Sequence, residues 1–174
     1  SGSPRLLEVL KTDSVDVEQN RRSIVMCRDA GIEVQGSFIL GTPGETSADL
    51  EATYRFAEES RLDVCKIYVL TPYPATTESF EAESLCFVSV DMDWSLLNFD
   101  FYRNWERHII LNDSMSRLEI RSWYLRFQRL VKRRELGRLV QKASLRSVFT
   151  RVRNPAKLLN DAKVVTGKLV GMFQ

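Results

Sequence analysis

The sequence lacks most of the residues from which metal sites and nucleophilic active sites are built. Its 174 residues include one histidine and three cysteines, and Cys27, Cys65 and Cys86 form no C-x-x-C pair. Three scattered thiols predict reduced cysteines in a cytosolic protein rather than a disulfide framework or a metal centre. His108 has none of the partners that a catalytic triad needs, so we expect a packed or surface residue there.

Long apolar runs are also missing. No stretch of about 18 apolar residues occurs, so the sequence predicts no transmembrane helix. The opening residues, SGSPRLLEVLK, lack the charged and apolar segments of a secretory signal. These absences predict a cytoplasmic protein, with peripheral attachment to a membrane as an open alternative. The chain also lacks an initiator methionine, and we expect it to be part of a longer protein.

Charge is distributed unevenly along the chain. Residues 1–100 carry 8 lysines and arginines against 18 acidic residues, a net charge of −10, and residues 101–174 carry 17 against 5, a net charge of +12. Three interpretations of the basic half stay open. It is a solvated helical face that complements the acidic half, a surface that docks on an anionic membrane, or a nucleic-acid-binding surface whose aromatic residues stack on bases.

Helical and strand patterns alternate between residues 14 and 70. Apolar residues at helical spacing, with capping residues before them, predict two helices, and runs rich in β-branched and aromatic residues predict two strands. The second half of the first strand is continuously apolar, which favours burial on both faces. Short connections between alternating elements predict parallel strands in an α/β fold. In chain order, the expected elements are a short helix at 4–10, then a helix ending near Gly31, a strand at 32–40, a helix beginning near Thr46 and a strand at 63–70.

The second half of the chain follows another pattern. Residues 71–101 are rich in proline, serine, threonine and aromatics, which predicts a long irregular segment that either is functional itself or covers another part of the protein. From about residue 102 the pattern is helical, with apolar residues near one face and Gly137 as an expected interruption. That face is formed by Leu118, Ile120, Tyr124, Phe127, Leu130 and Val131.

The stretch GSFILGTPGET at residues 36–46 is the most informative motif. A buried strand ends there in Gly41 and Gly44, where backbone without side chains can approach a flat ligand closely. In parallel α/β proteins, ligands lie at the carboxyl ends of the strands. The next strand ends in aromatic and proline residues, which suit a purine-like ring. An ordinary strand-to-helix turn is the alternative, and spacing alone leaves both interpretations open.

These segments resemble the second half of a radical S-adenosylmethionine domain. The likeness covers about residues 1–80 in the family's order, through SGSPRLLEVLK, the run around GSFILGTPGET, and KIYVLTPYPATT. Within that superfamily the chain resembles the branch with a cobalamin-binding domain, to which anaerobic Mg-protoporphyrin IX monomethyl ester cyclases belong. The segment RSWYLRFQRLVKR is similar to that branch's C-terminal A-Y-R-R-F-Y-x-R-P, from which Trp123 and Gln128 depart.

The resemblance implies the C-terminal part of a partial (β/α) barrel, followed by a mostly helical basic region. It divides the chain into barrel at 1–80, an irregular connecting or lid segment at 81–101, and helices at 102–174. It also implies contacts with S-adenosylmethionine. Ser1–Ser3 match a turn that holds the ribose or methionine part, the G-x-I-x-G-x-x-E motif maps onto Gly36 through Glu45, and the end of the second strand lies against the adenine. The implied cofactor-binding residues are Ser3, Gly36, Ile39, Leu40, Gly41, Glu45, Tyr68, Pro72 and Tyr73.

The C-x-x-x-C-x-x-C signature of a [4Fe–4S] cluster is absent from this chain. The resemblance therefore implies that the cluster lies in an N-terminal remainder of the parent enzyme, and that this chain alone is inactive. The chain would form the adenosyl-facing rim and cover a small-molecule substrate, such as a tetrapyrrole or lipid, with cobalamin as a further cofactor. The alternative is a non-catalytic α/β and basic helical module that binds RNA, a membrane surface or a partner protein.

Overall fold

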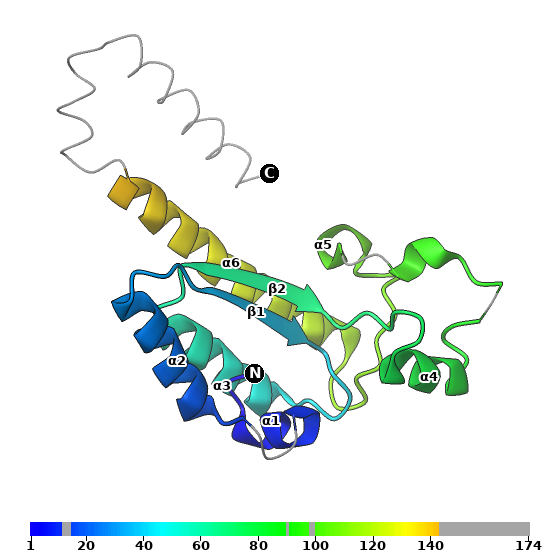
Figure 1. Ribbon diagram of the computed structural model, residues 1–174. Coiled ribbons are helices and arrows are strands. Elements are labelled where there is room, and N and C mark those ends of the chain that lie inside the picture. The colour runs from blue at the N-terminus through cyan, green and yellow to red at the C-terminus, as the bar shows by residue number, and fades with distance from the viewer. Residues whose placement is uncertain (12–14, 90, 98–99, 143–174) are drawn as a thin grey trace, which may run out of the picture. The chain divides into compact units, whose positions relative to one another are not determined.

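A computed structural model describes residues 1–11, 15–89, 91–97 and 100–142 of the chain. Strands β1 (Gln35–Leu40) and β2 (Val64–Val69) pair in parallel, with Gln35 opposite Val64 and Leu40 opposite Val69. Figure 1 shows the two arrows side by side and pointing the same way. Helix α3 (Ser47–Glu59) connects them. The predicted α/β class with parallel strands is confirmed.

The first helices follow the predicted capping signals. Helices α1 (Pro4–Lys11) and α2 (Val17–Asp29) precede the sheet, and the Asp16 side chain accepts a hydrogen bond from the N–H of Gln19 at the start of α2. Beyond α2, Gly31 has a φ of +76°, and the N–H of Ile32 bonds back to the carbonyl of Cys27 at 2.8 Å. Because Ile32 closes the helix, the strand begins at residue 35 rather than at 32.

Helix α3 begins with a complete capping box. The Thr46 side chain accepts the N–H of Asp49, and the Asp49 carboxylate accepts the N–H of Thr46 at 2.9 Å. Two backbone donors at the helix start are satisfied in this way, so Thr46 fixes where the helix begins.

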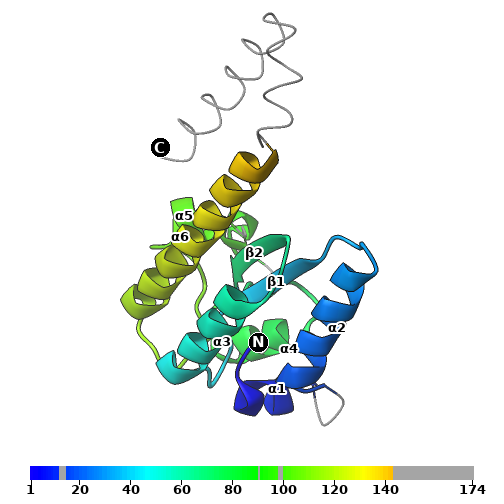
Figure 2. The same ribbon diagram turned by 90° about the vertical axis from the view of Figure 1, so that its left-hand side faces the viewer.

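One face of the sheet forms the core together with two helices. Phe38 of β1 contacts Phe56 of α3 at 6.3 Å between ring centroids, and Phe127 of α6 (Arg117–Lys142) at 6.4 Å. Leu40 and Val69, at the ends of the strands, are also buried. Figure 2 shows α3 between α2 and α6. The apolar residues of β1 and β2 therefore hold both helices on this face.

The other face of the sheet is open, and the prediction that β1 is buried on both faces is wrong. Exposed and buried residues alternate along β1, and Ile39 is 52% exposed. Along β2, Lys66 is likewise exposed and Tyr68 only half-buried. Within the described residues no helix or strand packs on this side of the two-stranded sheet. The apolar run of β1, whose pattern predicts burial on both faces, is therefore buried only on the face that packs against α3 and α6.

The segment 71–101 is more regular than predicted. It contains helix α4 (Thr77–Ser84), a 3₁₀ helix (Trp94–Leu97) and the start of α5 (Phe101–Asn104). The N–H of Ser79 bonds to the Thr76 side chain, which caps α4. A small core forms where Ala82, Leu97, Ile109 and Leu111 pack together. Threonine capping and this packing stabilise regular structure in the segment, which its proline-rich and serine-rich composition did not predict.

Helix α6 confirms most of the predicted apolar face. Ile120, Tyr124 and Phe127 are buried, but Leu118 is 64% exposed, so its assignment to that face is wrong. Residues 118 and 120 are two positions apart and point to opposite sides of a helix. Gly137 does not interrupt α6, which continues to Lys142.

The described chain divides into one unit at Ser1–Gln128 and another that begins at Arg129. The boundaries predicted at residues 80 and 101 stay predictions. The basic stretches predicted after residue 142 lie outside the described residues. None of the described helices has the length and apolar character needed to cross a bilayer.

Candidate functional site

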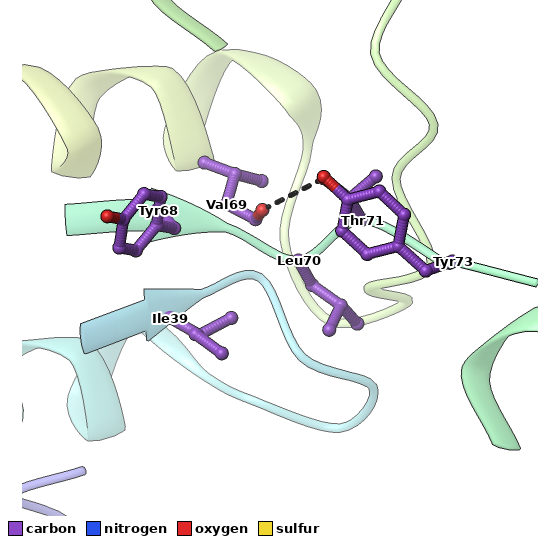
Figure 3. Close-up of a pocket in the computed structure, with 6 residues that line it drawn as sticks. All are labelled: Ile39, Tyr68, Val69, Leu70, Thr71 and Tyr73. Atoms are coloured by element: carbon purple, nitrogen blue, oxygen red, sulfur yellow. Dashed lines mark hydrogen bonds between the residues drawn. The ribbon is translucent and has the colours of Figure 1, made fainter. Parts of the chain in front are cut away.

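A pocket of about 380 Å³ opens at the carboxyl ends of the two strands. Figure 3 shows Ile39 at the end of β1, Tyr68 on β2, and Tyr73 beyond the end of β2. The Thr71 hydroxyl donates to the carbonyl of Val69 at 3.3 Å and holds the chain as it leaves the strand. The lining residues are Ile39, Tyr68, Val69, Leu70, Thr71 and Tyr73. Two aromatic rings and an aliphatic side chain can pack against a flat ring here.

The turn after β1 is closed by its own carboxylate. Glu45 is 1% exposed, and its Oε2 accepts the N–H of Gly41 at 2.6 Å and of Thr42 at 3.2 Å. Burial raises the pKa of Glu45 to about 7. The two backbone hydrogen bonds lower that pKa, but their effect is smaller than the effect of burial. The N–H of Gly44 is also used, by Asp113 Oδ1 at 3.1 Å. These N–H groups are engaged within the protein, so they are not available to bind an anionic ligand.

Asn112, which belongs to a distant segment of the chain, forms hydrogen bonds with the same turn. Its Nδ2 donates to the carbonyls of Thr42 at 2.6 Å and Glu45 at 2.8 Å. Its Oδ1 accepts the N–H of Met115 at 2.7 Å, which orients the amide. Sequence reasoning missed Asn112, since nothing in the local pattern IILND indicates a contact with a turn 67 to 70 residues earlier.

Ser3 lies in a polar network under the start of α3. Its hydroxyl donates to Asp49 Oδ1 at 2.5 Å and accepts the N–H of Leu6 at 3.3 Å. Arg5 forms an ion pair with the other oxygen of Asp49. Burial acts to raise the pKa of Asp49, but hydrogen bonds from Arg5, Ser3 and Thr46 outweigh it and hold that pKa well below its usual range.

The structure brings together three of the nine predicted cofactor-binding residues. Ile39, Tyr68 and Tyr73 line the pocket. The other six lie elsewhere. Ser3 and Glu45 bond within the protein, Leu40 and Pro72 are fully buried, and Gly36 and Gly41 turn toward Leu62 and Ile120, away from the open face. Their roles toward a cofactor stay predictions.

Gly41 is required by backbone geometry. Its φ is +77°, and a Cβ there would lie 3.5 Å from Ile120 Cδ1 and 3.6 Å from Val69 Cγ1. Glycine tolerates this conformation without strain, whereas a β-branched residue does not. Gly41 therefore serves the turn and its packing on α6, whatever else it does.

His108 is a packed residue, as predicted. It is buried, its Nε2 lies 3.0 Å from the carbonyl oxygen of Leu70, and its ring meets Phe101 edge to face at 5.2 Å between centroids. Because Leu70 lines the pocket, His108 supports the pocket wall from behind.

The cysteines are free thiols in three different environments. Cys65 is buried, Cys27 half-buried and Cys86 exposed. No group of three or more histidine, cysteine or acidic side chains suited to a metal ion occurs in the part of the chain that the structure describes.

Comparisons with known proteins identify relatives of part of the chain. An uncharacterized methyltransferase of Pyrococcus horikoshii is 36% identical over 76 residues, 44% of this chain and 16% of that protein. The anaerobic magnesium-protoporphyrin IX monomethyl ester cyclase of Rubrivivax gelatinosus is 38% identical over 69 residues, 37% of this chain and 12% of the cyclase. A tRNA-2-methylthio-N(6)-dimethylallyladenosine synthase of Pseudomonas savastanoi is 32% identical over 77 residues, 44% of this chain and 17% of the synthase. No family model matches the chain.

The chain spans less than a fifth of the length of each of these relatives. All three belong to one superfamily, and the resemblance that the sequence indicates is confirmed by them. Over 37% to 44% of its length, this chain is therefore similar to members of the radical S-adenosylmethionine superfamily.

Proposed function

We propose that this chain forms the adenosyl-facing rim and the substrate cover of a radical S-adenosylmethionine enzyme of the cobalamin-dependent type. The rim consists of the ends of β1 and β2, and the cover is the segment 81–101. The iron–sulfur motif would lie in a preceding part of the parent, and the chain alone would be inactive.

The observation that carries the proposal is the open sheet face that ends in the pocket. Ile39 and Tyr68 lie opposite each other in the parallel register, and both line that pocket. Ligands of parallel α/β proteins bind at this end of the strands. An open inner face is also what a part of a barrel presents when its other strands are absent. Relatives from the same superfamily support the same conclusion.

The described residues fit S-adenosylmethionine and do not fit a [4Fe–4S] cluster. Cys65 lies on the helix-facing side of β2, whereas Cys27 is on α2 and Cys86 follows α4, so these thiols do not form a cluster site. The pocket fits the adenine of S-adenosylmethionine, which would pack against Ile39, Tyr68 and Tyr73. In the parent, the cofactors supply the radical chemistry, and this chain's residues bind, orient and exclude water.

Several finer parts of the proposal rest on the family branch. Cobalamin as a further cofactor and a tetrapyrrole or lipid as substrate are inferred from the branch that the sequence resembles, and the likeness to the cyclase of Rubrivivax gelatinosus supports the tetrapyrrole. The remainder of the parent protein is the expected partner. A cytoplasmic location, with peripheral attachment to a membrane, belongs to the same proposal.

The sequence that precedes Ser1 in the parent gives the first test. We expect a C-x-x-x-C-x-x-C motif about 100 to 150 residues upstream, within the length of a typical domain. A parent without that motif would rule out the enzyme class.

The substitution Ile39→Glu in the parent protein tests the rim. Ile39 is exposed in this chain, so the fold should survive, while a carboxylate facing the adenine should weaken S-adenosylmethionine binding by about tenfold or more. The matched control is Met26→Glu, since Met26 is 71% exposed on α2, away from the sheet face. Equal affinities of the two variants for S-adenosylmethionine, measured by isothermal titration calorimetry, would refute the proposal that Ile39 faces the adenine. Gly41→Val is less suitable, because strain and contact with Ile120 would destabilise the fold itself.

The basic half supports a second candidate, a module that binds RNA, a membrane surface or a partner protein. Residues 101–174 carry a net charge of +12, from 17 basic and 5 acidic residues. Binding of anionic vesicles or of single-stranded RNA should then weaken steeply as salt rises. If the chain binds neither the vesicles nor the RNA at low salt, the basic residues form a solvated surface.

A further inference from the structure

The connection between α5 and α6 contacts both loops that leave the strands. His108 Nε2 lies 3.0 Å from the carbonyl oxygen of Leu70, which follows β2 and lines the pocket. Because a carbonyl oxygen can only accept, the imidazole donates this bond through Nε2. Asn112 donates to the carbonyls of Thr42 and Glu45, in the turn after β1, at 2.6 and 2.8 Å. The loops at the carboxyl ends of the two strands are therefore held by two side chains of one connection.

The apolar side chains of the same connection belong to another environment. Ile109 and Leu111 pack with Ala82 of α4 and Leu97 of the 3₁₀ helix in the small core. Both Ala82 and Leu97 are part of the segment 81–101, the proposed substrate cover. The polar side chains of the connection thus bond to the rim, and its apolar side chains pack against the cover.

Further contacts fix this connection between the cover and the rim. Leu70, which lines the pocket, also packs against the small core. Arg117 Nη1 donates to the carbonyls of Trp105 at 2.8 Å and His108 at 2.5 Å, which holds the start of the connection on α6. His108 and Asn112 are both buried, so the loss of either side chain would leave a carbonyl of a rim loop without its donor. A shift of the connection would therefore move both loops.

We propose that residues 108–112 are a positioning segment, which sets both loops of the S-adenosylmethionine rim and connects them to the substrate cover. His108 positions the loop after β2, and Asn112 positions the turn after β1. This inference rests on the proposed function, and it adds how the cofactor site is regulated. A substrate that orders the cover also orders the rim, so it tightens cofactor binding. By thermodynamic linkage, the cofactor tightens substrate binding by the same factor.

Two equally buried leucines give a matched test of the connection to the cover. Leu97 and Leu62 are both 8% exposed, but Leu97 lies in the core of the cover, whereas Leu62 precedes β2 at the end of the sheet away from the pocket. In the parent protein, Leu97→Ala should weaken S-adenosylmethionine binding about threefold by isothermal titration calorimetry. Leu62→Ala should leave it unchanged, at a temperature where both variants are folded. Equal affinities of the two variants would overturn the proposal.

The hydrogen bonds of the positioning segment are tested by their own variants. His108→Leu should weaken S-adenosylmethionine binding by a similar factor, and His108→Gln, whose amide can still donate to the carbonyl of Leu70, should restore it. Asn112→Ala should also weaken binding. Its combination with Leu97→Ala should weaken binding by less than the product of the two effects, because both act through the same segment. Unchanged affinity in folded His108→Leu and Asn112→Ala, or the full product in the double variant, would contradict the proposed positioning.

Amide hydrogen exchange in the 174-residue chain measures the same connection without the cofactor. The N–H groups of Leu70 and Gly41 are both hydrogen-bonded within the rim. Leu97→Ala should speed exchange at these two amides about threefold relative to Leu62→Ala, because it loosens the rim locally. Equal exchange rates in the two variants would show that the cover does not hold the rim. The Ile39→Glu experiment tests cofactor binding separately, so a failure of the proposed function is distinguishable from a failure of the positioning segment.

Discussion

The substitution Glu45→Gln should remove a pH dependence from the stability of this protein. Glu45 is buried beneath the turn after β1, and burial raises its pKa from an ordinary 4.5 to about 7. Glutamine keeps a carbonyl oxygen for the N–H groups of Gly41 and Thr42 but has no charge to bury. The variant therefore retains the turn's hydrogen bonds and loses the titration.

The sign and size follow from proton linkage. In the folded state the Glu45 carboxyl holds its proton to higher pH than in the unfolded chain, so its contribution is fully present below pH 4.5 and is lost as pH rises to about 7. Between pH 5.5 and 8, the free energy of unfolding should fall by about 2 kcal/mol through this group alone. Above pH 8 both states are ionised and the contribution is flat.

Urea unfolding followed by tryptophan fluorescence would measure this at pH 5.5 and pH 8. The difference between wild type and Glu45→Gln isolates the group, because every other titrating side chain is common to both. Glu8→Gln, which alters an exposed carboxylate on α1, is the control and should keep the wild-type pH dependence. If Glu45→Gln shows the same fall in stability as wild type, the buried carboxyl is not the group that titrates.

Three further predictions concern the turn and the α3–α6 contact, all measured by urea unfolding. Gly41→Ala and Gly44→Ala should each cost about 1 kcal/mol, because both glycines have positive φ and a Cβ at Gly41 would meet Ile120 and Val69 only at ordinary van der Waals distances; no loss of stability in either variant would contradict this. Asn112→Ala should cost about 2 kcal/mol by leaving two carbonyls unsatisfied, and a neutral result would show that water replaces the amide. Arg126→Met should cost about 1 kcal/mol, because Arg126 pairs with Glu51 at 2.5 Å, and a full loss of that cost in 1 M salt would assign it to charge alone.

The contact between α3 and α6 explains why Arg126 matters. Its guanidinium lies 4.2 Å from the ring centroid of Tyr54 and 4.7 Å from that of Trp123, while it pairs with Glu51. The indole N–H of Trp123 donates to the Ser47 hydroxyl at 2.9 Å. Trp123 departs from the family's C-terminal segment, and in this chain it holds α6 on α3.

Local features of the fold were predictable from the sequence. The capping residues Asp16 and Thr46 mark helix starts because their side chains accept backbone N–H groups three residues further along the chain. The aromatic and β-branched runs likewise predict the two parallel strands, because strand propensity and short connections are properties of the local sequence. Pocket residues Tyr68 and Tyr73 were predictable because the carboxyl ends of parallel strands are where such folds bind ligands.

Other features depend on contacts between distant segments. The sequence predicted backbone at Gly41 and Gly44 that a flat ligand can approach, but in the structure Glu45 and Asp113 accept the N–H groups of these two residues. Composition predicted an irregular segment at 71–101, but packing of Ala82 against Leu111 accompanies a helix there.

The sequence by itself determined where the helices before each strand begin, which ends of the strands meet, and to which superfamily the segment is related, because each depends on neighbours in the chain or on motifs read in order. Only the tertiary structure decided which face of β1 is covered and which backbone donors of the following turn are engaged within the protein. Those properties arise from side chains dozens of residues apart, such as Asn112 and Thr42, whose meeting no local pattern encodes.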